Sequence, residues 1–274
     1  SKGEFGSSVV AASLGALNLV DYFTPDNYAY LTQFDLDFGS GSAVWFAYKN
    51  YNLICVGGKE GVLYMLDADS LGSKDHHTPL YATPRLGNDA VTFEGEGIWG
   101  APSMWKDAPK GETWIYVPVS GPVSKEAPRF PMTNGSHPHG SIMAFKVVMN
   151  PGTHKPILQP AWISGDFDLP EPVAIANGVV FALSTGENPN QVVPSAAVIG
   201  RGYKGLLSNA QRTQSTRHAI LYALDARTGK KLYDSGALIT SWTHFSGLAV
   251  AEGRVYAVDH DSNVYCFGLK SREK

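Results

Sequence analysis

The sequence predicts an all-β protein, and three observations support this fold class. Short runs rich in Val, Tyr, Phe, Ile and Trp recur along the 274 residues, each bounded by Gly, Asn, Asp or Pro. No long stretch repeats apolar residues at the i, i+3, i+4 and i+7 spacing of an amphipathic helix. The 29 glycines and 17 prolines supply frequent turns, and charged residues make up only 17% of the chain.

Strand-like runs recur in four groups along the chain. Their third runs begin at Tyr64, Met143, Tyr222 and Tyr265, so the spacings between groups are 79, 79 and 43 residues. Regular spacing of this kind indicates internal repeats, here compact four-strand units of which the first three carry insertions. The predicted units, called blades below, cover residues 42–84, 100–164, 172–236 and 246–269.

Repeated four-stranded sheets bury both of their faces only when they stand side by side around an axis. The sequence therefore predicts a β-propeller of four-stranded antiparallel blades. The first run of a blade is small and apolar, as in 174–176 and 248–250, which suits the crowded centre of a ring. A β-sandwich is the alternative, but it does not explain the repeats.

About four blades and a partial blade at the N-terminus account for the whole chain. Residues 1–23 are expected to be the remnant of a preceding blade, and 270–274 a charged tail. We expect a single propeller, or the C-terminal part of a longer one whose N-terminal half is missing. The alternative is a closed small ring in which Leu17–Phe23 completes the last blade.

Charge and hydropathy narrow the classes of partner. The formal net charge of −3 gives no electrostatic reason to expect a nucleic acid or an anionic membrane. The longest apolar stretch, residues 43–48, is far shorter than the ~20 residues that a membrane-spanning helix needs. We therefore expect an unidentified protein or small molecule as partner, with self-association as a further expectation if a blade face is uncovered.

One repeat carries a family resemblance. The segment LYALDARTGKKLYDSG (221–236) resembles the repeat of PQQ-like propellers, the quinoprotein alcohol dehydrogenase-like superfamily, and LYMLDADSLG (63–72) resembles a degenerate copy. The whole chain is similar to bacterial PQQ-binding-like β-propeller repeat proteins. The resemblance implies a periplasmic or secreted location and, for an enzymatic member, PQQ and Ca²⁺ as cofactors. It indicates a fold more than an activity, because such folds host many functions.

Departures from the enzymes of this superfamily favour a non-catalytic role. In the enzymes a Trp closes each repeat, whereas Tyr233 stands at that place here. No two cysteines are adjacent, so the vicinal disulfide is missing, and no calcium-ligand set or catalytic Asp can be matched. We expect a binding or scaffold module. The alternatives are part of a quinoprotein dehydrogenase, and a structural protein similar in role to the outer-membrane assembly lipoprotein of the same fold.

The strand order places the long inserts on one face of the disc. Because successive strands of a blade are antiparallel, loops between second and third strands share a face with the connections between blades. The inserts 120–140 and 186–218 both fall on that face. Long loops in a compact domain are commonly functional, so we expect a ligand to bind there.

Five residues of this face are the candidate ligand-binding or cofactor-binding residues. Lys59 and Glu60 lie in the hairpin GGKEG, where an ordinary solvated ion pair is the competing interpretation. Trp99, Trp242 and His244 lie in connections between blades, where aromatic packing is the competing interpretation.

The candidate metal ligands are His137, His139 and Asp261. Neutral imidazoles at positions i and i+2 can ligate a metal, and Asp261 lies in a loop of the same face. Ordinary loop histidines are the competing interpretation. No catalytic residue can be assigned, and the motifs of phosphate-binding loops, zinc proteases and serine hydrolases do not occur.

Two cysteines complete the set of reactive residues. Cys55 and Cys266 both lie in apolar strand-like runs. We expect two buried small hydrophobic side chains, with one disulfide as the alternative.

Overall fold

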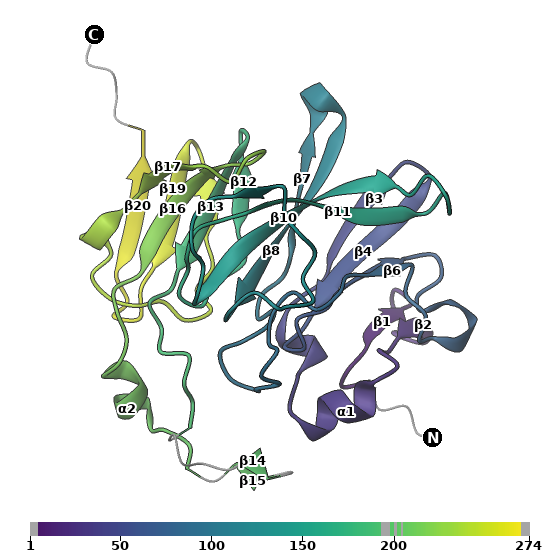
Figure 1. Ribbon diagram of the computed structural model, residues 1–274, viewed down its shortest axis with the longest axis horizontal. Coiled ribbons are helices and arrows are strands. Elements are labelled where there is room, and N and C mark those ends of the chain that lie inside the picture. The colour runs from purple at the N-terminus through teal and green to yellow at the C-terminus, as the bar shows by residue number, and fades with distance from the viewer. Residues whose placement is uncertain (1–4, 193–197, 200–201, 204, 270–274) are drawn as a thin grey trace.

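Four antiparallel sheets follow one another along the chain and stand side by side like the leaves of a fan (Figure 1). The computed structural model describes residues 5–192, 198–199, 202–203 and 205–269. The predicted tail at 270–274 and the first four residues of the predicted N-terminal remnant lie outside this part. Within it, no helix is long and apolar enough to cross a membrane.

The strands of each blade pair in chain order. Blade 1 contains β3 (Val44–Tyr48), β4 (Tyr51–Gly57), β5 (Leu63–Asp67) and β6 (Tyr81–Ala82). Blade 2 contains β7 (Ser103–Asp107), β8 (Glu112–Ser120), β10 (Gly140–Met149) and β11 (Pro156–Ile163), with β9 (Met132–Thr133) parallel to β11 at its outer edge. Blade 3 contains β12 (Ala174–Ala176), β13 (Val179–Ser184), β16 (Ile220–Asp225) and β17 (Lys231–Asp234). Blade 4 contains β18 (Ala249–Ala251), β19 (Arg254–Val258) and β20 (Val264–Gly268).

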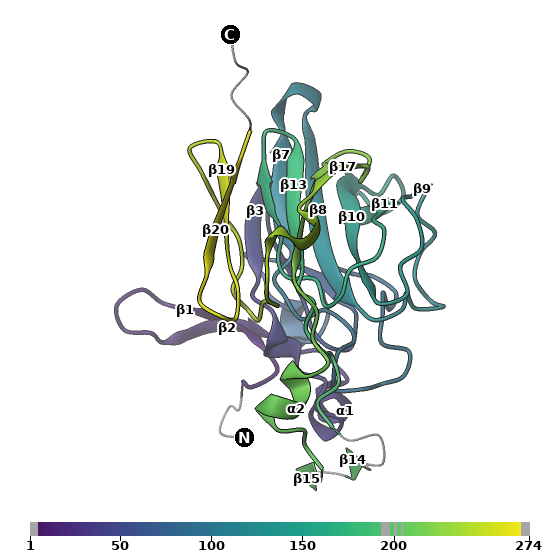
Figure 2. The same ribbon diagram turned by 90° about the vertical axis from the view of Figure 1, so that its left-hand side faces the viewer.

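Shorter elements lie outside the blades. The hairpin of β1 (Val9–Ala12) and β2 (Leu19–Phe23) projects to one side, and α1 (Tyr28–Gln33) follows it (Figure 2). The insert between β13 and β16 carries β14 (Val198–Ile199), β15 (Gly202–Tyr203) and α2 (Asn209–Thr213). In the described part of the chain, 3₁₀ turns cover residues 38–40, 73–75, 108–110 and 236–238.

The predicted fold class is confirmed by this arrangement. The blades are antiparallel apart from the short β9, and the first strands of successive blades, β3, β7, β12 and β18, contact one another as strands near a propeller axis do. The alternative in which Leu17–Phe23 completes the last blade is wrong. β2 pairs with β1, and Phe23 packs against Phe38 and Tyr64 beside blade 1. The assignment of the hairpin to a preceding blade stays a prediction.

Apolar layers between successive blades form the core. Because side chains alternate along a strand, Ile115 and Val117 of β8 face blade 1, whereas Trp114 and Tyr116 face blade 3. β8 is consequently buried along all but its first residue. A third layer joins blades 3 and 4 and includes Leu221 and Val255. Sheets that bury both faces leave few places for charged residues, which explains why charged residues make up only 17% of the chain.

The exposure of the two cysteines differs, and this corrects the sequence expectation. Cys55 is fully buried between blades 1 and 2, whereas Cys266 is exposed on β20. Alternation is the reason, because Tyr265 and Phe267 point toward blade 3 and Cys266 therefore points away from it. The two thiols are not paired with each other.

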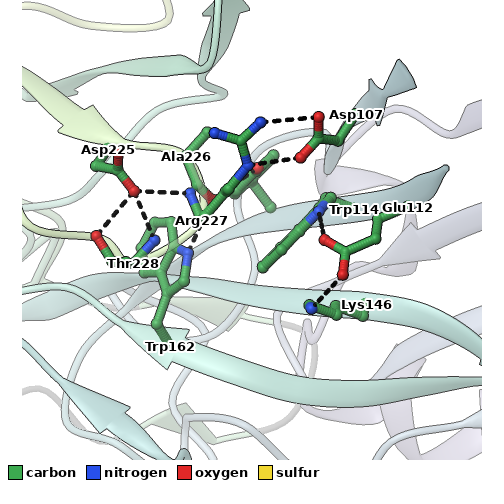
Figure 3. Close-up of polar contacts among 10 residues, drawn as sticks. Asp107, Glu112, Trp114, Lys146, Trp162, Asp225, Ala226, Arg227 and Thr228 are labelled. Carbon is green, nitrogen blue, oxygen red and sulfur yellow. Dashed lines mark hydrogen bonds and ion pairs between the residues drawn. The ribbon is translucent and has the colours of Figure 1, made fainter. Parts of the chain in front are cut away.

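A turn of blade 3 is anchored in blade 2 by one backbone carbonyl. The hydroxyl of Tyr116 donates to the oxygen of Ala226 at 2.9 Å. Nε1 of Trp162 donates to the same oxygen at 3.0 Å (Figure 3). Gly229, with φ of +71°, lies against the Trp162 ring, and a Cβ there would collide with the indole. Glycine therefore serves both the left-handed turn and the contact between blades.

A partly buried ion pair strengthens the same junction. Nε and the terminal nitrogen of Arg227 donate to the two oxygens of Asp107 at 2.6 and 2.9 Å (Figure 3). Asp107 is fully buried, and its hydrogen bonds with Arg227 hold the pKa of the carboxyl below its ordinary value. A bidentate pair of this kind also fixes the orientation of the two groups.

The Ala226 anchor should make a measurable contribution to stability. Replacing Tyr116 by Phe removes one of two buried donors, and we expect the free energy of unfolding to fall by about 1 kcal/mol. Trp162→Ala also opens a cavity, with an expected loss of about 3–5 kcal/mol. Tyr233→Phe is the matched control, since Tyr233 is 43% exposed and its change should stay within ~0.5 kcal/mol. Urea unfolding measures all three, and equal effects of the two Tyr→Phe changes would contradict the role of the anchor.

Candidate functional site

The connections between blades and both long inserts gather on one face, called the loop-rich face. It lies at the lower side of the fan in Figure 1, where α2, β14 and β15 extend from the insert between β13 and β16. The connection 83–102 leads from blade 1 to blade 2, 164–173 from blade 2 to blade 3, and 235–248 from blade 3 to blade 4.

A cavity of about 340 Å³ opens among these segments and is called the loop-face cavity. Its charged and titratable lining residues come from two connections and both inserts, and they are Glu94, Glu96, His139, Asp168, Glu187 and Arg217. Four carboxylates therefore stand against one guanidinium and one imidazole. The cavity is electronegative, and such walls concentrate cations.

Glu187 anchors two segments of this face. Its carboxylate is almost completely buried, and its two oxygens have separate partners. Oε1 accepts a hydrogen bond from the guanidinium of Arg212, and Oε2 lies 2.7 Å from Nδ1 of His244. Arg212 belongs to α2, whose N-terminus is capped by a reciprocal pair of hydrogen bonds between Ser208 and Gln211. A buried charge that is paired in this way fixes the arrangement of its partners.

Glu96 differs from the other glutamates of the cavity. Oε2 of Glu94 accepts hydrogen bonds from the backbone nitrogens of Gln191 and Val192, so its charge is already partnered. The carboxyl of Glu96 has no hydrogen bond or ion pair with any residue in the described part of the chain. Burial raises the pKa of Glu96, and the nearby charge of Asp89 adds to the shift. A cation in the cavity would relieve this cost.

One imidazole and two carboxylates converge beside the cavity. Nδ1 of His139 lies 2.6 Å from Oδ2 of Asp166 and 3.8 Å from Oδ1 of Asp168. The backbone nitrogen of His139 donates to the other oxygen of Asp166 at 2.9 Å, which fixes that carboxylate. The hydrogen bond with Asp166 raises the pKa of His139 above its ordinary value.

Lys59 and Glu60 lie on this face, but they do not form the solvated ion pair that was the competing interpretation of the GGKEG hairpin. Lys59 is 7% exposed, its Nζ lies 2.7 Å from Oδ2 of Asp37, and it lies over the Trp99 ring at 5.0 Å. Glu60 accepts a hydrogen bond from Nδ2 of Asn27 at 2.6 Å. That interpretation is wrong because Lys59 pairs with Asp37, whereas Glu60 accepts its hydrogen bond from Asn27.

Trp99 and His244 come together, and the Trp242 ring lies beside His244, with ring centroids 5.9 Å apart. Trp99 and His244 line the same small hollow beside Glu187. Trp242 stacks on His260 with ring centroids 4.1 Å apart. These contacts serve packing between blades, and a ligand-binding role for the three residues stays a prediction.

The three metal ligands predicted from the sequence are not brought together. Nδ1 of His137 is hydrogen-bonded to the carbonyl of Gly135, and the neighbour of Asp261 is His260, at 3.7 Å. Among the described residues, one group could hold a metal ion, and it joins His139 to Asp166 and Asp168. Asp166, Asp168, Glu96, Glu187 and Arg217 were not among the predicted site residues. The spacing Asp-Phe-Asp two residues after β11 is the available signal, because alternate residues of an extended segment share a side.

The residues present do not fit PQQ in the loop-face cavity. PQQ carries three carboxylates, and a site for it needs several cationic partners. The cavity offers four carboxylates and one guanidinium, so like charges would repel each other. We therefore derive no chemical step through a quinone.

The His139–Asp166 pair can be checked by titration. Because hydrogen bonding to Asp166 favours the imidazolium, we expect the pKa of His139 to lie above the ordinary 6.5 in metal-free protein. The stability that the pair contributes is therefore present below pH 6.5 and is lost as pH rises through the shifted pKa. Asp166→Asn should return the pKa toward 6.5. NMR titration of the imidazole protons measures the pKa of His139 in the unchanged protein and in Asp166→Asn. Identical titration curves would show that Asp166 does not cause the raised pKa.

Similarity to known proteins is found among solved structures. No family model matches the chain, and no curated protein matches it. Among solved structures, the chain is similar to BamB from Moraxella catarrhalis, with 11% sequence identity and a TM-score of 0.44. The match covers 96% of this chain and 67% of that one.

Proposed function

We propose that this propeller is a non-catalytic binding module that holds the ammonium or guanidinium group of a small molecule in the loop-face cavity. The observation that carries the proposal is the state of Glu96. Its carboxyl lines the cavity, is partly buried, and has no partner among the described residues. A cationic group would supply the missing partner, and Asp168 on the same wall adds negative charge.

A binding role is favoured over catalysis by the way the other charges are engaged. Both oxygens of Glu187 are used by Arg212 and His244, and Nζ of Lys59 is used by Asp37. These groups are held by their partners and keep the segments of the loop-rich face in place. The resemblance to periplasmic and secreted propeller repeat proteins supports a location outside the cytoplasm.

Calorimetry with a panel of amines and guanidines, putrescine and agmatine included, tests the proposal. We expect saturable binding that weakens roughly 10- to 150-fold in Glu96→Gln, because that change removes one charge-assisted contact of roughly 1.5–3 kcal/mol. Glu252→Gln makes the same chemical change in an exposed turn on the opposite face and should leave binding unaltered.

Two outcomes would count against the amine-binding role. One is a panel without saturable binding, and the other is an equal effect of the two Glu→Gln changes. The dehydrogenase alternative has its own readout, since an enzyme should reduce a dye acceptor when it is given PQQ, Ca²⁺ and an alcohol.

A second candidate function, self-association, is favoured by the uncovered side of blade 4. Among the described strands, none pairs with the outer edge of β20, whereas β5, β10 and β16 each have an outer neighbour. Val264 and Val258 lie opposite each other, 69% and 40% exposed. Exposed Leu14 and Val20 of the β1–β2 hairpin offer an apolar counterpart on the same chain. We propose the hairpin of a second copy as the occupant of this edge.

Light scattering after gel filtration tests self-association. We expect the measured mass to rise with protein concentration, and Val264→Lys to keep the chain monomeric because a charge on the contact face opposes burial. Leu232→Lys, on an exposed part of β17, is the matched control and should associate like the unchanged protein. A monomer at the highest soluble concentration would contradict this candidate function.

A further inference from the structure

We infer that His139, Asp166 and Asp168 form a binding site for a first-row divalent transition metal ion, of which Zn²⁺ and Co²⁺ are the probes. This inference goes beyond the amine-binding role and does not rest on it. One atom from each of the three side chains lies within 4.8 Å of the others, so small side-chain rotations bring all three to the ~2.0–2.2 Å that such ligands need from a single ion.

The two aspartates are positioned by the connection between blades 2 and 3. Asp166 and Asp168 flank Phe167, whose side chain is buried between these blades. Phe167 is therefore fixed by packing, and the two carboxylates beside it remain at the surface. His139, from the insert 120–140, contacts both carboxylates there. The hydrogen bond from the backbone nitrogen of His139 to Asp166 keeps this carboxylate beside the imidazole.

The ligand types select the class of metal. Imidazole binds Zn²⁺, Co²⁺ and similar ions well, whereas Mg²⁺ and Ca²⁺ prefer sets made only of oxygen. Two carboxylates and one imidazole satisfy three positions of a tetrahedral ion. His139 and Asp168 also line the loop-face cavity, so water or a ligand in the cavity can occupy the remaining position.

Arg217 is the one cation that competes for this site among the described residues. A terminal nitrogen of Arg217 lies 3.7 Å from Oδ2 of Asp168, and the side chain is 74% exposed. It is therefore free to turn toward solvent when an ion binds. Removing Arg217 should make the site more negative and tighten metal binding. If the three side chains formed only a surface ion-pair network, removing Arg217 would not increase the affinity for a metal.

Calorimetry with Zn²⁺ and visible spectroscopy with Co²⁺, on protein without an affinity tag, test the inference. We expect one site per chain. His139→Gln and Asp166→Asn should each weaken the affinity by at least the roughly 10–100-fold that loss of an outer-shell partner costs. Arg217→Ala should strengthen it several-fold. Excess Ca²⁺ should not compete with Co²⁺.

Matched controls separate this site from the other histidines and from the amine site. His137→Gln and Asp261→Asn make the same chemical changes at loop positions, the first partly exposed and the second exposed, and should leave the metal affinity unaltered. Glu96→Gln should weaken amine binding and keep metal binding, so the two proposals fail independently. The ligand side chains are partly exposed, and thermal unfolding of each metal-free variant checks that the fold is retained.

Three results would overturn the inference. The first is the absence of Zn²⁺ binding in the unchanged protein. The second is an equal loss of affinity in the His137 and Asp261 controls, and the third is a Co²⁺ spectrum that the Asp166 substitution does not alter.

Discussion

The whole molecule depends on the burial of both faces of each inner blade. β8 is buried along nearly its full length because blade 1 covers one face and blade 3 covers the other. Apolar packing of this kind supplies most of the stability, but it does not by itself set the rotation of one blade against the next. The carbonyl of Ala226, held by Tyr116 and Trp162, adds that directional constraint.

The same packing determines where chemistry can occur. Strand interiors have little room for charge, so polar side chains concentrate in the connections, which cross from blade to blade on one face. The loop-face cavity, the buried carboxylate of Glu187 and the group around His139 all lie in or beside these crossings. A rigid set of sheets thereby holds side chains from distant parts of the chain at fixed distances, which is the usual division of labour between scaffold and loops.

The fold was predictable because its signal is repeated. Anchors such as Tyr64 and Tyr222 recur at regular spacing, and strand alternation then assigns each loop to a face. The site was less predictable, because it depends on pairs that only tertiary structure makes. Lys59 pairs with Asp37 rather than Glu60, and His139 meets Asp166 rather than His137. Tyr233 is an exposed residue of blade 3, whereas Trp162 of blade 2 joins two blades through its hydrogen bond to the carbonyl of Ala226.

Glu187 has a consequence for communication within the molecule. One carboxylate serves the arm that carries α2 and the connection that leads to blade 4, and these partners lie far apart in sequence. If a ligand drew Arg212 away, His244 would be the remaining side-chain partner of the Glu187 carboxylate among the described residues. The insert between β13 and β16 and the connection to blade 4 therefore share one buried carboxylate, and a coupling free energy between binding events at these two segments has the same size in both directions.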